Sequence, residues 1–351
     1  MLINLGNIVF GGKGNGGSST ASAYVVPDGM NFGYSTLTEF PSNDFDFSQK
    51  TNFTYAWYNC QSLASFPALD LSSGTNFSYA WYGCSRLTEF PMLNLGNGTN
   101  FQYAWQNCSR LTSFPQLDLS KGTIFNSTWY NCSSLTSFPQ LDLSLGTNFS
   151  YAWRNCNKLT SFPQLDLGKG TSFQYAWYSC SGLTEFPLLN ISQGTNFSYT
   201  WQNCSSLTSF PALDLSNGTS LNSTWYNCSS LTSFPQLDLS KGISFNSTWY
   251  GCKALTEFPM LNLSKGSDFS YAWQNCSSLT TLGGFGAIKA SFNLSYSPNL
   301  TVESIMNVIT QAADLNSLGI TGKKMTFGST NLNKLTDEQK AVATSKGWTL
   351  A

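Results

Sequence analysis

The stretch of sequence that decides the fold is residues 75–98, which read TNFSYAWYGCSRLTEFPMLNLGNG. Closely similar stretches precede and follow it in strict register, so that ten copies of a 24-residue unit fill residues 51–282. Ten of the 11 tryptophans keep this period, and so do all 10 cysteines: Cys60, Cys84, Cys108, Cys132, Cys156, Cys180, Cys204, Cys228, Cys252 and Cys276. Spacing this regular predicts a solenoid, in which each unit buries its apolar side against its neighbours.

Within the unit, large apolar residues recur at the positions of Phe77, Trp81, Leu87 and Leu93. Phe77 and Trp81 are four residues apart, which predicts one face of a short helical turn. The later positions follow the spacing of a leucine-rich coil and leave room for a strand of a few residues that ends at Pro91. We therefore expect an α/β repeat solenoid of the leucine-rich type, with short parallel strands and short helical turns.

Two positions in the turns are restricted. The position of Gly98 is glycine at all nine junctions between repeats, from Gly74 to Gly266, which predicts either a positive φ or a close backbone approach. The residue before each cysteine is Asn, Gly or Ser, as at Asn59 and Gly83. This choice predicts a left-handed residue that closes the turn.

The regular cysteines suggest disulfides or a metal site, but their spacing argues against both. Equivalent residues in adjacent coils point the same way at ~4.8 Å, which is wider than the Cβ separation that a disulfide prefers. No pair of the C-x-x-C type, as metal sites use, occurs in the chain. We expect a ladder of buried thiols that act as small apolar side chains, in a protein that assembles in a reducing compartment.

Composition narrows the function classes. Charged residues make up 10% of the chain and the net charge is −1, so a nucleic acid is not an expected partner. The chain has no histidine, which removes the commonest general base and transition-metal ligand. No apolar run approaches the ~20 residues of a membrane span, so membrane insertion is not expected. We predict a protein that is not an enzyme and that needs no cofactor or metal.

Acidic residues offer one alternative. Repeats with glutamate at the position of Glu89 have asparagine five residues later, at Asn94, whereas repeats with serine, such as Ser113, have aspartate there, as at Asp118. Each full repeat thus carries one carboxylate at these two positions. Exchange between Asp and Asn favours turn capping. Calcium held by stacked aspartates is the alternative.

Tyrosines recur in two stripes, which are the candidate binding residues. They suit contacts with glycan or protein, because tyrosine offers amphipathic area at low entropic cost. Lateral packing between coils is the competing interpretation. The first stripe comprises Tyr55, Tyr79, Tyr103, Tyr151, Tyr175, Tyr199 and Tyr271, and the second comprises Tyr58, Tyr82, Tyr130, Tyr178, Tyr226 and Tyr250.

The two ends of the chain differ from the repeats. Residues 1–10 are apolar and predict an anchor, residues 11–20 a Gly/Ser-rich linker, and residues 21–50 a cap with a degenerate coil built on Phe32, Leu37, Phe40 and Pro41. Residues 283–351 predict a small α/β cap that hides the open edge of the solenoid. Its expected elements are a helix over residues 301–313, a strand over 324–327, a second helix that begins at a capping box of Thr336 and Gln339 and stops at Gly347, and a closing strand that holds Trp348.

The run at residues 56–60, AWYNC, followed by Leu63 and Phe66, resembles the core of BspA-like leucine-rich repeats. Tryptophan replaces the usual phenylalanine, and Phe-Pro replaces a β-branched pair. The resemblance covers residues 32–282. Residues 300–309, 327–332 and 334–340 are similar to C-terminal caps of such repeats in proteins of gut Bacteroidales and their crAss-like phages. The resemblance implies adhesion and surface recognition and carries no catalytic residues.

These observations favour a phage virion adhesin or fibre protein. We expect it to lie on the virion surface, to dock into a larger virion assembly through residues 1–10, and to bind a host-surface glycan or protein through the solenoid flank. The alternatives are a BspA-type adhesin on a bacterial cell surface and a structural fibril or decoration subunit without a ligand. The sequence leaves homo-oligomer formation open.

Overall fold

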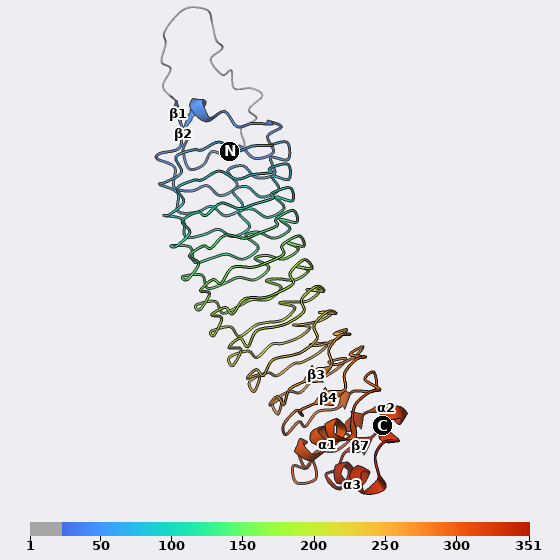
Figure 1. Cartoon of the computed structure of the whole chain (residues 1–351). Coiled ribbons are helices and arrows are strands. Elements are labelled where there is room, and N and C mark those ends of the chain that lie inside the picture. Colours follow the sequence, from blue (N-terminus) through green and yellow to red (C-terminus); the bar gives the residue numbers. More distant parts are fainter. Residues whose placement is uncertain (1–22) are drawn as a thin grey trace, which may run out of the picture. The chain divides into compact units, whose positions relative to one another are not determined.

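A computed structural model describes residues 23–351. The predicted anchor at 1–10 and linker at 11–20 lie outside the described residues. The chain forms two compact units, of which the first takes in the described residues up to Leu159 together with Leu165–Leu167. The second comprises Thr160–Gln164 and Gly168–Ala351. In each unit successive 24-residue coils stack directly on one another, which confirms the predicted leucine-rich type of repeat solenoid (Figure 1).

The first part of each coil alternates between two kinds of hydrogen bond. The N–H groups of Phe53, Tyr55 and Trp57 donate to carbonyls of the next coil at 2.7, 3.1 and 2.8 Å. The intervening N–H groups of Ala56 and Tyr58 close turns on the carbonyls of Phe53 and Tyr55. The expected helical turn is therefore a run of consecutive tight turns, because every second N–H group leaves the coil and no helical ladder can form.

Two residues of each coil adopt the left-handed conformation. The position of Asn59 has φ between 56° and 73° in all ten repeats, as predicted. The position of Tyr55 is left-handed too, which was not predicted, with φ of 57–63° at every tyrosine of the first stripe. Tyrosine adopts this conformation rarely, so the hydrogen bonds and the ring packing of the coil hold it there.

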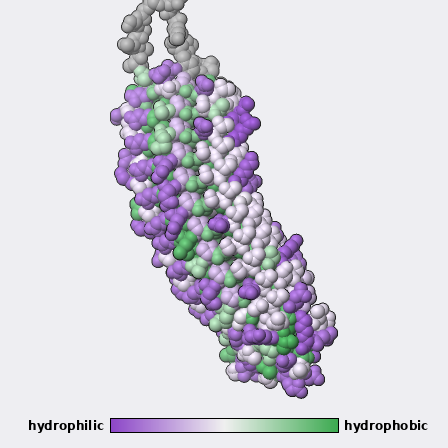
Figure 2. All heavy atoms as spheres, in the orientation of Figure 1, coloured by the Kyte–Doolittle hydropathy of each residue, from purple (hydrophilic) through white to green (hydrophobic). Residues whose placement is uncertain are grey.

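Parallel bridges join the coils in two columns. One lies at the predicted strand and includes the strands β3 (Glu257–Phe258) and β4 (Thr281–Leu282). The second lies just before the phenylalanine and was not predicted; it runs from Asn52 to Asn148 in the first unit and from Ser172 to Asp268 in the second. On the face that Figure 2 shows, bands of similar hydropathy cross successive coils of a unit, because equivalent residues stack.

The core is a set of aromatic ladders. Trp81, Trp105 and Trp129 are fully buried and stack at 5.2 and 6.0 Å between ring centroids. The rings of Phe90 and Phe114 meet the tryptophans edge-on at interplanar angles of 81–87°. Such stacked and edge-to-face contacts add to the free energy gained from burial.

The junction glycines are explained by close approach and not by a positive φ. A Cβ atom on Gly122 would overlap the ring of Phe125 and lie 3.0 Å from the carbonyl oxygen of Leu119. Gly98 and Gly146 meet the same obstacle from Phe101 and Phe149. The sequence allowed either a positive φ or a close approach, and the structure supports the close approach.

We expect Gly122→Ala to destabilise the protein by about 1–3 kcal/mol, because the new methyl group displaces the buried Phe125 ring. Urea unfolding followed by tryptophan fluorescence measures this loss. Gly29→Ala is the matched control, since a Cβ atom at Gly29 would meet nothing within 4 Å. An equal effect of both substitutions would contradict the steric explanation.

The cysteines are free and buried, as predicted. They are not purely apolar, however. The thiol of Cys108 donates to the carbonyl of Trp81 at 3.3 Å, and that of Cys228 donates to the carbonyl of Trp201 at 3.2 Å. Each thiol therefore also links its coil to the preceding one.

A small N-terminal coil precedes the repeats and contains β1 (Tyr24–Val25), the 3₁₀ helix η2 (Ser42–Asp44) and β2 (Phe45–Asp46), with β1 and β2 parallel. Phe32 and Phe40 are buried as expected, whereas Leu37 is only partly buried. Lys50, not singled out in the sequence, donates to the carbonyls of Pro27, Asp28 and Met30 at 2.9–3.1 Å. Burial lowers the pKa of Lys50 to about 8.

The C-terminal cap contains a three-stranded parallel sheet in the order β5 (Phe292–Asn293), β6 (Lys324–Thr326), β7 (Thr349–Leu350). Its helices are α1 (Val302–Gln311), α2 (Gly328–Leu332) and α3 (Asp337–Ser345). The predicted helices match α1 and α3, including the capping box, whereas α2 and β5 were not predicted. Trp348 lies just before β7.

The cap supplies hydrogen-bonding partners to the last coil. The hydroxyl of Ser304 in α1 donates to the carbonyl of Thr280 at 3.0 Å and accepts from the N–H of Leu282 at 3.0 Å. The side-chain amide of Gln311 donates to the carbonyl of Gly283 at 2.8 Å. The edge of the last coil is thus paired by side chains, as an exposed edge requires.

Candidate binding surface

The two predicted tyrosine stripes merge into one cluster at the start of the first unit. Tyr55, Tyr79 and Tyr103 stack on one another at 4.8 and 4.5 Å. Tyr58 and Tyr82 stack at 4.8 Å in the second stripe, and the rings of Tyr55 and Tyr58 meet edge-on at 5.3 Å. Lateral packing between coils is therefore part of what these residues do.

Tyr34 extends this cluster, although it is not among the candidate binding residues predicted from the sequence. Its ring meets that of Tyr58 at 5.4 Å, and its side chain is 59% exposed. Tyr34, Tyr55 and Tyr58 line a pocket of about 300 Å³ together with Asn31. Tyr34 has φ of 59° and its N–H bonds to the carbonyl of Tyr58, 24 residues ahead, whereas equivalent bonds in the full repeats span 23 residues. Because of this shift by one residue, the 24-residue period of the sequence does not place Tyr34 where it lies in the coil.

The other predicted tyrosines form smaller groups. In the first unit, the guanidinium of Arg154 lies over the rings of Tyr130 and Tyr151 at 5.2 and 5.6 Å. In the second unit, Tyr175 contacts Tyr199 at 4.4 Å and Tyr178 at 5.5 Å.

Tyr226 and Tyr250 pair at 4.6 Å farther along the second unit. Serine replaces the first-stripe tyrosine at Ser127, Ser223 and Ser247. The stripes are therefore interrupted within each unit.

Packing also fixes the protonation of these rings. Burial raises the pKa of Tyr79 to about 12, and the neighbouring hydroxyls of Tyr103 and Tyr55 add to the shift. The pKa values of Tyr58 and Tyr226 are raised in the same way. These phenols keep their protons at neutral pH and can donate hydrogen bonds to a ligand.

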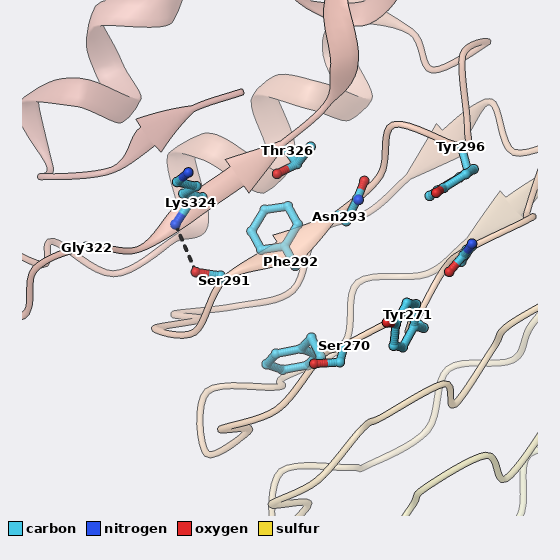
Figure 3. A pocket seen from close by; sticks show the side chains of 11 residues that line it. Ser270, Tyr271, Ser291, Phe292, Asn293, Tyr296, Gly322, Lys324 and Thr326 are labelled. Carbon is cyan, nitrogen blue, oxygen red and sulfur yellow. Dashed lines mark hydrogen bonds between the residues drawn. The ribbon is translucent and has the colours of Figure 1, made fainter.

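Tyr271 is the most exposed tyrosine of the two predicted stripes, at 61%, and lines a pocket between the last coil and the cap (Figure 3). The pocket has a volume of about 380 Å³. Its aromatic lining includes Tyr271, Phe292 and Tyr296, of which Tyr296 is 43% exposed.

Polar groups complete this pocket: Gln274 from the coil, Asn293 from β5, and Lys324 and Thr326 from β6. The N–H of Lys324 donates to the hydroxyl of Ser291 at 2.9 Å and fixes the segment before β5 beside β6. Tyr271 and Gln274 keep the repeat period, whereas Asn293, Tyr296, Lys324 and Thr326 lie outside the repeats, so the sequence could not bring these groups together.

The aspartates of the coils cap turns. The carboxylate of Asp118 accepts from the N–H and the hydroxyl of Ser120 at 3.0 and 2.7 Å, and these donors lower the pKa of Asp118. Within residues 23–351, no three or more His, Cys, Asp or Glu residues gather as a metal site requires. None of the helices in the described part of the chain is long and apolar enough to cross a membrane.

Comparison with known proteins gives structural likeness only. No protein-family model and no curated protein matches the chain. Among solved structures, a leucine-rich repeat protein from Bacteroides ovatus has 14% identity and a TM-score of 0.45, covering 89% of this chain and 91% of its own. A leucine rich cell surface protein from Faecalibacterium prausnitzii has 16% identity and a TM-score of 0.35, covering 92% and 82%.

The functional domain of InlJ from Listeria monocytogenes, described as including a cysteine ladder, is also similar. It has 15% identity and a TM-score of 0.29, over 85% of this chain and 67% of that one. At these identities and TM-scores the likeness carries no conclusion about binding. The assignment to the leucine-rich-repeat type rests on the coils themselves.

Proposed function

We propose that this protein is a non-enzymatic adhesin that binds a glycan of a host surface through its exposed tyrosines. The observation that carries the proposal is the pocket of Tyr271 and Tyr296. Exposed aromatic rings stand there beside the amide, ammonium and hydroxyl groups of Gln274, Lys324 and Thr326. A sugar ring presents apolar C–H faces and hydroxyl groups, so it can use both kinds of contact.

The tyrosine cluster of the first unit supports the same function. Its rings cover one another by stacking, which leaves ring edges and hydroxyls for contact with a ligand. Tyr34 and Tyr55 remain 59% and 43% exposed at the start of the stack. A protein ligand is the second candidate, because tyrosine is also favoured at protein interfaces.

Tyr271→Gly provides the first test of the proposal. Glycine removes the ring and adopts the φ of 60° at this position without strain, so the fold is retained. We expect binding to the best glycan of an array of bacterial and mammalian surface glycans to weaken at least tenfold, or about 1.4 kcal/mol. Isothermal titration calorimetry measures the dissociation constant.

Tyr24→Ala is the control, because Tyr24 is 55% exposed and lies in β1, outside this pocket. If Tyr271→Gly and the parent protein bind the glycan with equal affinity, the pocket is not part of the binding site. If no glycan and no host-surface protein is retained, the result favours a structural fibril or decoration subunit.

The more specific proposal is that the adhesin belongs to a phage virion. The free, buried cysteines support it, since they suit folding in a reducing cytoplasm before release by lysis. The resemblance of the cap to proteins of gut phages also supports it. Docking through residues 1–10 is part of this proposal. Mass spectrometry of purified particles from the source sample tests it, and detection on the bacterial envelope alone would favour the BspA-type surface adhesin.

A further inference from the structure

A second hollow in the second unit is lined by lysines. It has a volume of about 680 Å³ and lies between the turn at residues 264–267 and the cap segments at 289–290 and 320–323. Lys265, Lys289 and Lys323 contribute their side chains from these three segments. The hollow shares no lining residue with the pocket of Tyr271, although Lys323 and Lys324 are neighbours along the chain.

These three lysines have no structural partner within the part of the chain that the structure describes. No carboxylate lies within 4.0 Å of their ammonium groups, and no side-chain hydrogen bond ties them down. Other lysines of the protein are used differently. Lys50, Lys334 and Lys346 each donate to two or three backbone carbonyls and thereby stabilise the fold.

Three unneutralised cations around one hollow repel one another, and an anionic ligand relieves that repulsion. Apolar side chains also line the hollow: Ile243, which is 53% exposed, Ile320 and Ala290, beside the turn that holds Ser264 and Ser267. A ligand that fits must therefore carry several negative charges on a framework with apolar surface.

We infer that this hollow binds an acidic polysaccharide, a chain of sugar rings with carboxylate or sulfate groups. The sugar rings supply C–H faces for the isoleucines, and the anionic groups lie against the lysines. A nucleic acid fits less well, because the hollow has no aromatic side chain on which a base can stack and the whole chain carries a net charge of −1.

The test uses the full chain and immobilised polygalacturonate, with dextran sulfate as a second acidic probe and neutral dextran as the reference. We expect both acidic polymers to bind and neutral dextran not to bind. The variant Lys265→Gln/Lys289→Gln/Lys323→Gln should bind the acidic polymers at least tenfold more weakly. Binding by the parent should fall as NaCl approaches about 1 M, where charges are screened beyond ~3 Å.

The matched control is Lys158→Gln/Lys169→Gln/Lys253→Gln, which removes the same charge from three exposed lysines outside the hollow. It should retain the affinity of the parent. Equal losses in the two triple variants would overturn the inference, as would equal binding of neutral dextran or tighter binding of single-stranded DNA. Tyr271→Gly leaves these lysines in place, so it should retain binding to the acidic polymers. Failure of this site can therefore be distinguished from failure of the tyrosine pocket.

Discussion

The protein should lose stability steeply above pH 9 in the presence of a reducing agent. Burial raises the pKa of Cys108, Cys156, Cys204 and Cys252 from 9.0 to about 12. Between these values the unfolded chain releases thiol protons that the folded chain keeps. The unfolded state then binds fewer protons, so the free energy of unfolding falls as the pH rises.

At pH 10 each of the four thiols costs about 1.4 kcal/mol, or roughly 6 kcal/mol together. The pKa values of Cys132, Cys228 and Cys276 are raised by burial as well and act in the same direction. Lys50 acts in the opposite direction, because its pKa is lowered to about 8, but it is a single group.

Urea unfolding at pH 7.5 and at pH 10 measures the effect. The variant Cys108→Ala/Cys156→Ala is the control, and its difference between the two pH values should be smaller by about 3 kcal/mol. A free energy of unfolding that is the same at both pH values would show that the thiols ionise as easily in the folded protein as in the unfolded chain.

Trp105→Ala should be the most damaging single substitution in the first unit. Trp105 is fully buried, stacks on Trp81 and Trp129, and meets the rings of Phe90 and Phe114. Removing a buried tryptophan side chain leaves a cavity and costs about 3–5 kcal/mol. Because each coil contacts mainly its neighbours, the damage should concentrate in this coil and the two beside it.

Two measurements check this prediction. Urea unfolding gives the loss of stability, and limited proteolysis should yield a new cut within residues 99–122. Met92→Ala is the control, since Met92 is 64% exposed and its truncation should change stability by less than about 0.5 kcal/mol. A stability loss below about 1 kcal/mol for Trp105→Ala would show that the remaining ladders hold the coil without this ring.

The features that repeat could be predicted from the sequence, since the period itself carries the information. Phe77, Trp81 and Leu87 mark the core, and the choice of Asn or Gly before cysteine marks a left-handed residue. The left-handed tyrosines could not be predicted, because local preference disfavours that conformation and contacts between coils impose it. The consecutive tight turns within the coil escaped prediction for a related reason: a four-residue spacing does not reveal that alternate N–H groups bond to another coil.

The candidate site could be predicted only where it keeps the period. Tyr55, Tyr79 and Tyr271 stand out as members of a stripe, and the structure shows that they differ in exposure and in neighbours. Tyr296, Lys289 and Lys323 lie in the cap, where no repeat relates them. Whether these residues lie close to those of the last coil depends on how the cap packs on that coil.

The alternating hydrogen bonds of the coil also bear on how such a gene can change in length. In the first part of each coil, the outward N–H groups donate to carbonyls of the next coil, and the carbonyls accept the same set of bonds from the coil before. Unequal recombination that adds or removes 72 base pairs inserts or deletes one complete 24-residue unit and leaves every interface of the same type. A frame-preserving insertion of any other size shifts the register of donors and acceptors. Lineages should therefore differ by whole coils, which alters the number of exposed tyrosines without a new fold.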